Sequence, residues 1–223
     1  MNALNQIQLL AILVLPVVLA ITVHEAAHGW VANRLGDRTA LMLGRVTFNP
    51  LRHIDPIGTV VVPAVSFLLT GFLFGWAKPV PVNPNQLRNP RRDMALVALA
   101  GPGVNLLMAL LWGLLIKAGV LLWEVSPWVS LPLVYMGAAG VLINVFLMAL
   151  NLVPLLPLDG GRVLNSLLPR QWSYYFSRLE PFGLVLLMLL LVSGLLSPLL
   201  LPVVSGIIGL LPGANIVHEL FHL

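Results

Sequence analysis

An apolar run from Ile7 to Val31 is long enough to cross a bilayer, yet it contains His24, Glu25 and His28. About 20 apolar residues in a helix span the hydrocarbon core, so the run predicts a membrane helix. Ionisable side chains in such a segment are costly and typically mark a functional site. His24 and His28 share one helix face and can bind one Zn²⁺ together. Glu25 beside them could take a proton from a metal-bound water.

The composition of the whole chain is that of a membrane protein. Of its 223 residues, 59% are hydrophobic and 9% are charged, whereas soluble domains have about 25% charged residues. The mean hydropathy is +0.96. Further apolar runs lie at 57–76, 94–123, 131–153 and 182–211. We expect an all-α polytopic membrane protein of about five to six membrane helices. A single domain would fill residues 1–223, with its core at 7–165 and C-terminal helices at 180–212.

Charge and cysteine content narrow the chemistry. The net charge of +4 comes from few charged residues, so it bears on membrane orientation and gives no case for a nucleic-acid partner. The chain has no cysteine, which excludes disulfides and thiolate ligands. Histidine, aspartate and glutamate are therefore the strong metal ligands that remain.

Asp159 is the predicted third metal ligand. A catalytic zinc takes three protein ligands and keeps one position open for water. Asp159 lies in a stretch rich in proline and glycine, 151–161, in which the backbone cannot continue a helix. An aspartate in a polar turn needs no ligand role by itself. Together with the two histidines it completes a zinc site.

The position of Asp159 also constrains the topology. The histidines lie near the end of the first apolar run, and Asp159 lies just past the end of the fourth. If all four runs crossed the membrane, these ends would be about 30 Å apart on opposite sides. We therefore expect the segment 57–76, which proline and glycine interrupt, to be re-entrant or broken. A small β-hairpin is the expectation for the partly β-branched stretch 40–50.

The basic residues support the same topology. It places the connections 33–56, 77–93 and 157–179 on one side of the membrane, and these carry all the lysines and arginines except Lys117. The positive-inside rule makes that side cytoplasmic. The expectation is a multi-pass protein of the cell membrane with its active site near the cytoplasmic face.

A second His-Glu-x-x-His pattern, at 218–222, ends the chain. It has the same spacing, but it has no third ligand near it in sequence and it lies where helices fray. We interpret it as a terminal amphipathic turn. The alternatives are adventitious metal binding or a plug near the active site.

Three motifs carry a family resemblance. The stretches 24–28, 101–105 and 151–161 resemble, in this order, the signature of the site-2 protease family of intramembrane zinc metalloproteases. The stretches 48–59 and 75–81 resemble its compact prokaryotic branch, which has no PDZ or CBS domain.

The resemblance implies one catalytic zinc ion and a peptide-bond hydrolysis within or beside a transmembrane helix. The implied metal ligands are His24, His28 and Asp159. Glu25 would be the general base. Asn105 and Asn151 would match positions that hold the substrate backbone or stabilise the oxyanion. The expected partners are a transmembrane protein or peptide substrate and the lipid bilayer.

Several alternatives stay open from the residues alone. The polar groups could belong to a membrane metal transporter, or to a catalytically idle zinc-binding scaffold. Asn105 could be a polar residue that packs two helices together. His53 could support the metal site, although a solvated loop histidine is the preferred interpretation.

Overall fold

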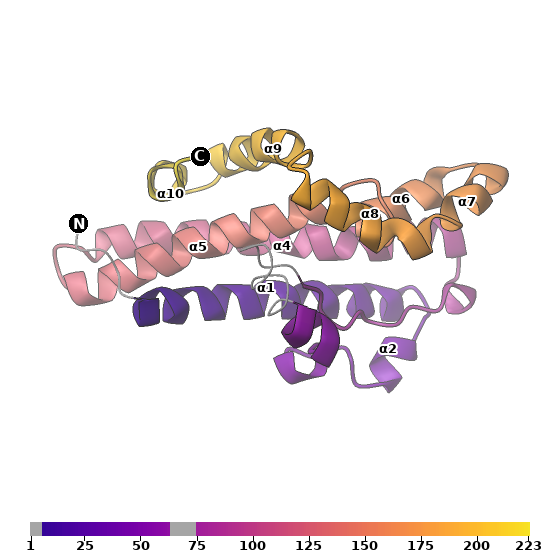
Figure 1. Cartoon of the computed structure of the whole chain (residues 1–223). Coiled ribbons are helices and arrows are strands. Elements are labelled where there is room, and N and C mark those ends of the chain that lie inside the picture. The colour runs from indigo at the N-terminus through magenta and orange to yellow at the C-terminus, as the bar shows by residue number, and fades with distance from the viewer. Residues whose placement is uncertain (1–5, 63–74) are drawn as a thin grey trace.

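The computed structural model describes residues 6–62 and 75–223, and three long apolar helices form the centre of the molecule (Figure 1). These are α1 (Gln6–Arg34), α4 (Pro90–Leu121) and α5 (Pro127–Asn151). Each is long and apolar enough to cross a membrane, α1 from Ile12 onward. Polar side chains deep within them are therefore shielded from water mainly by neighbouring helices.

The remaining helices are shorter. They are α6 (Asp159–Leu167), α7 (Arg170–Ser177), α8 (Glu180–Val192), α9 (Ser197–Gly209) and α10 (Ala214–Phe221). Helices α7 and α8 are bent by 64° and make at most one span together. Helix α9 is about 20 Å long, less than a hydrocarbon core of about 30 Å.

The described residues therefore contain three membrane-capable helices, or four if α7 and α8 form one span. They do not confirm the expectation of five to six membrane helices, part of which falls on residues 63–74, outside the described residues. The last apolar run is interrupted where Gly194, with a φ of +72°, separates α8 from α9. This turn divides residues 182–211 into two short helices.

Small residues set the distance between α4 and α5. A Cβ atom at Gly137 would lie 2.7 Å from a side-chain carbon of Ile116 and 3.0 Å from the carbonyl oxygen of Trp112. Ile116, Val141 and Val145 are fully buried where these helices meet. Close backbone approach at small residues is the usual way in which membrane helices pack, because lipid provides no hydrophobic drive for their association.

The connection between α1 and α4 returns to the end of the bundle from which it leaves. The Arg88 amide donates to the Leu35 carbonyl at 3.1 Å, and the Trp76 amide donates to the Gly58 carbonyl at 2.9 Å. The connection thus makes no net crossing, as the position of Asp159 predicts. The re-entrant path predicted for 57–76 falls largely on residues 63–74, outside the described residues, and stays a prediction.

Residues 40–50 form no strand, and the prediction of a β-hairpin there is wrong. A short helix, α2 (Thr39–Met42), takes its place. Asp37 starts it by accepting from the Thr39 amide at 2.9 Å and from the Thr39 hydroxyl at 2.5 Å. Asp37 also accepts from the Asn83 amide at 2.6 Å. Burial raises the pKa of Asp37, but these bonds outweigh it and hold the pKa below its usual range.

Candidate metal centre

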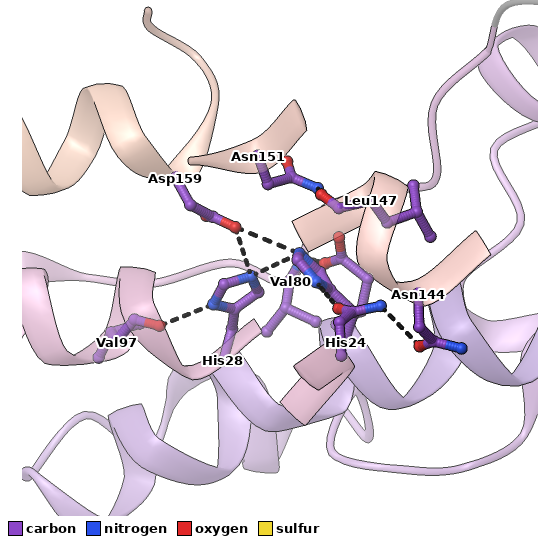
Figure 2. A network of polar contacts seen from close by, with 10 residues as sticks. His24, His28, Val80, Val97, Asn144, Leu147, Asn151 and Asp159 are labelled. Atoms are coloured by element: carbon purple, nitrogen blue, oxygen red, sulfur yellow. Dashed lines mark hydrogen bonds and ion pairs between the residues drawn. The ribbon is translucent and has the colours of Figure 1, made fainter. Parts of the chain in front are cut away.

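His24 and His28 of α1 meet Asp159, the first residue of α6, in the interior of the bundle (Figure 2). One ligand atom from each residue lies within 4.8 Å of the others, and all three side chains are buried. The Nε2 atoms of the two histidines are 3.1 Å apart. Asp159 Oδ2 is 3.2 Å from Nε2 of His24 and 3.4 Å from Nε2 of His28. The structure thus brings together the three predicted metal ligands.

The glycines after Asp159 allow it to reach the histidines. Helix α6 begins directly against the turn that follows α5, because Gly160 and Gly161 have no side chains. A Cβ atom at Gly160 would lie 2.6 Å from the Val153 carbonyl oxygen, and one at Gly161 would lie 2.7 Å from that of Leu155. Larger residues here would push the start of α6, and the carboxylate with it, away from α1.

The protonation of His28 follows from its backbone contact. Its Nδ1 atom lies 2.7 Å from the carbonyl oxygen of Val97 in α4. A carbonyl oxygen only accepts hydrogen bonds, so Nδ1 must carry the proton. The neutral ring then presents the lone pair of Nε2 to His24 and Asp159, which is the form that binds a metal ion.

A chain of amides sets the protonation of His24 in the same way. Asn144 of α5 donates from Nδ2 to the Gly140 carbonyl at 2.8 Å, which fixes the orientation of its amide. Its Oδ1 atom accepts from Asn105 Nδ2 at 2.9 Å, so Asn105 Oδ1 faces Nδ1 of His24 at 2.5 Å. The proton of His24 therefore lies on Nδ1, and its Nε2 lone pair also points into the site.

Asn144 and the Val97 carbonyl are the contributors to this site that sequence reasoning missed. The one available signal for Asn144 was its position in the middle of the apolar run 131–153, since an amide in a membrane helix needs a partner. A backbone carbonyl such as that of Val97 leaves no signal in the sequence.

We expect Asn144→Ala to weaken zinc binding by roughly 10–100-fold, the usual cost of losing such a supporting contact. Without Asn144, the Asn105 amide is free to turn its NH₂ group towards His24 and to favour the tautomer that carries a proton on Nε2. Competition with a chelator of known zinc affinity measures the change.

Ser130→Ala is the matched control for Asn144→Ala. Ser130 is also fully buried in α5 and donates to a backbone carbonyl, that of Gly119, at 2.7 Å. It has no contact with the histidines, so its loss should leave zinc affinity unchanged. Equal zinc affinities in the two variants would contradict the role given to Asn144.

The donor set fits a zinc ion. Two imidazole lone pairs and a carboxylate oxygen converge, and Asp159 Oδ2 is buried without a hydrogen-bond donor in the described residues. Like partial charges at such distances repel, so a cation between them accounts for the arrangement. Two nitrogen ligands and one oxygen ligand suit zinc and leave one position of a tetrahedron open.

The approach of α4 leaves the site no spare room. A Cβ atom at Gly101 would lie 2.5 Å from His24 Cε1 and 2.5 Å from His28 Nε2. Glycine is the one residue that allows α4 to pass this close to both rings. Gly101 is the first residue of the motif 101–105. The close packing of α4 against the histidines explains why this position is a glycine.

Glu25 is held by the segment 77–83, which runs from the end of the connection towards α4. The Val80 amide donates to Glu25 Oε2 at 2.8 Å, across 55 positions of sequence. No other hydrogen bond to this carboxylate is present in the described residues, so Oε1 stays available. A carboxylate held by one oxygen beside a zinc site can accept a proton with the other.

The other two polar residues singled out in the sequence lie outside the ligand group. Asn151 is half-buried and donates to the Leu147 carbonyl at 2.9 Å (Figure 2). His53 is 2% exposed and contacts the Thr47 carbonyl at 3.0 Å. The interpretation of His53 as a solvated loop residue is therefore wrong, because the connection folds over it.

The second His-Glu-x-x-His pattern gathers no third ligand among the described residues. His218 Nδ1 lies 3.3 Å from the Leu223 carbonyl oxygen, and His222 has a φ of +53°, past the end of α10. Figure 1 shows α10 at the opposite end of the bundle from α6. The spacing of the motif alone therefore does not make a metal site.

Comparison with known proteins adds an independent line of evidence. YwhC of Bacillus subtilis is 35% identical over 90% of this chain and 89% of its own length. Rip2 of Mycobacterium tuberculosis is 31% identical over 80% of this chain and 65% of its own length. MJ0392 of Methanocaldococcus jannaschii is 24% identical over 84% of this chain and 44% of its own length. The words zinc metalloprotease stand in the names of all three.

The chain belongs to the site-2 protease family of zinc metalloproteases. No family model and no solved structure matches the chain. The match to YwhC covers nearly the full length of both proteins, so this site-2 protease is of the same compact kind. It is a zinc metalloprotease with several apolar helices, and one buried group of residues in it is suited to the metal.

Proposed function

We propose that this site-2 protease cleaves peptide bonds inside the membrane, within or beside a transmembrane helix of its substrate. The supporting observation is where the ligands lie. His24 and His28 are buried in the membrane-capable part of α1, and α4 and α6 cover them. A site in this place meets a substrate at membrane depth, where a peptide bond is held in a helix and has little water around it.

The reaction needs a positioned base beside the metal. A zinc ion held by His24, His28 and Asp159 would activate a water and polarise the scissile carbonyl. Glu25 is the general base in this scheme: Oε1 takes the proton and returns it to the leaving amine. The Val80 amide keeps Oε2 in place during both transfers.

We assign Asn105 to the support of His24 and not to the substrate. It is fully buried, and its oxygen and its nitrogen are occupied by His24 and Asn144. Only one amide hydrogen of this buried side chain is unused, so its contacts favour support of His24 over contact with an oxyanion. Asn151 is half-buried, and its Oδ1 has no hydrogen bond in the described residues, so it is better suited to contact the substrate backbone.

The proposed location is the cell membrane, with the active site near the cytoplasmic face. Two contacts gather the basic connections at one end of the bundle: the Arg88 amide donates to Leu35, and the Arg91 side chain donates to the Leu168 carbonyl. A cluster of positive charge at one end of a membrane bundle favours the cytoplasmic side.

A metal transporter would need further ligands along a path through the membrane. In residues 6–62 and 75–223 only one group of three potential ligands is found. The geometry around Glu25 is that of a reaction site and gives no support to the transporter or scaffold alternatives.

Cleavage in liposomes tests the proposal. The purified chain is reconstituted with single-span peptides that carry helix-destabilising residues in mid-span, and mass spectrometry locates the cut. We expect a zinc-dependent cut within or at the edge of the apolar span. Cuts in water-soluble peptides alone would overturn the intramembrane assignment, and zinc uptake without any cleavage would replace it with transport.

A further inference from the structure

A pocket lies outside the metal centre, between the connection after α2 and the segment 77–83. Its volume is about 450 Å³, within the range of roughly 300–1,000 Å³ that small-molecule sites occupy. We call it the basic pocket. Besides two prolines it is lined by Leu43, Arg45, Leu51, Arg52, Ile54 and Lys78.

The charge of the basic pocket is uncompensated. Arg45, Arg52 and Lys78 line it, no lining residue is acidic, and none of the three has an ion pair in the described part of the chain. Asp55 follows the lining residues in sequence, but its carboxylate accepts from the Ile57 amide at 3.0 Å and the Gly58 amide at 2.7 Å. An anion is therefore the ligand that electrostatics favours here.

Arg45 gives the strongest indication of a ligand. Its side chain is 8% exposed, and its Nη2 atom donates to the carbonyls of Lys78 at 2.7 Å and Pro79 at 3.3 Å. Its Nε atom is buried and has no acceptor in the described residues. A buried guanidinium normally has a negative partner, because neutral carbonyls satisfy its hydrogens but not its charge.

The rim of the basic pocket is apolar and open. Of its lining residues, Leu51 is 73% exposed, and Leu43 and Ile54 are also exposed. Exposed apolar side chains beside a cationic pocket favour a ligand that has an anionic headgroup and hydrocarbon chains.

We propose that the basic pocket binds the phosphate of an anionic phospholipid, with the acyl chains along the apolar rim. Guanidinium groups match phosphate oxygens in geometry and charge, so Arg45 and Arg52 would grip the headgroup and Lys78 would add a point charge. The bound phosphate would neutralise Arg45, which holds the segment carrying Val80 and thus Glu25. This site is additional to the metal centre and does not require that the chain be a protease.

Native mass spectrometry of the full chain in a neutral detergent tests the proposal. The probes are phosphatidylglycerol, phosphatidylcholine and soluble glycerol phosphate. The variants are Arg52→Gln and Lys78→Gln, which alter exposed side chains and leave the backbone contacts of Arg45 in place. Arg92→Gln removes an exposed arginine on the same side of the bundle, outside the pocket, and serves as the matched control.

We expect the wild type and Arg92→Gln to retain phosphatidylglycerol over phosphatidylcholine. Each pocket variant should weaken that retention by about tenfold, which corresponds to about 1.4 kcal/mol. Equal retention in Arg52→Gln, Lys78→Gln and Arg92→Gln would overturn the site. Displacement of the lipid by equimolar glycerol phosphate would overturn the lipid as its occupant and leave a site for free phosphate esters.

Discussion

Glu25→Gln is expected to slow peptide cleavage by about 10²–10⁴-fold, the usual contribution of a general base. Glutamine has nearly the same shape, and its side-chain oxygen can still accept from the Val80 amide, as Glu25 Oε2 does at 2.8 Å. It cannot take a proton from water. Zinc content should therefore stay at the wild-type level while turnover of a transmembrane peptide is lost.

Glu219→Gln is the matched control. It makes the same change in the C-terminal His-Glu-x-x-His pattern, at an exposed position of α10. We expect this variant to cleave at the wild-type rate. Cleavage by Glu25→Gln within a few-fold of the wild type would show that the base lies elsewhere.

Gly101→Ala is expected to cost at least about tenfold in zinc affinity, although it adds a single methyl group. The new carbon would lie 2.5 Å from both His24 Cε1 and His28 Nε2. Either the rings turn away from Asp159 or α4 moves off α1, and both changes separate the ligands. Zinc content after dialysis against a weak chelator, together with the thermal unfolding midpoint, measures the effect.

Gly103→Ala serves as the control for Gly101→Ala. It lies on the same helix two residues later, and a Cβ atom there would meet no atom within 4 Å. Helix propensity favours alanine at both positions, so a difference between the variants reports the contact with the histidines. Full zinc binding by Gly101→Ala would contradict the close packing of α4 on the site.

The metal ligands could be predicted from the sequence because two of them are neighbours on one helix and few other residues could serve as the third. The histidine spacing is a property of a single helix, and a chain without cysteine offers few other ligands. The demand that Asp159 reach the histidines then predicted that the connection from Leu35 to Arg88 makes no net crossing. One chemical requirement thus constrained the topology of the chain.

The contacts that support the ligands could not be predicted in the same way. The tautomer of His24 depends on Asn105 and Asn144, which lie 81 and 120 positions away along the chain, and on a backbone carbonyl beyond them. These contacts come from the angle and register at which three helices pack. Hydrophobic pattern specifies a buried face, but not which amides meet on it.

Local propensity was misleading where a distant contact decides the structure. The β-branched residues of 40–50 favour a strand, yet a helical turn forms there. Asp37 accepts from the Thr39 amide at its start and also from the Asn83 amide. The large hydrophobic residues of this stretch are exposed, and one of them, Leu43, lines the basic pocket.

The most direct test of the account is zinc per chain in purified wild type, Asp159→Ala and His218→Ala. We predict about one zinc in the wild type and in His218→Ala, and much less in Asp159→Ala, because two histidines alone leave a zinc ion short of protein ligands. Zinc that survives the loss of Asp159 but disappears with His218 would move the metal to the C-terminus. That result would contradict both the site and the proposed reaction.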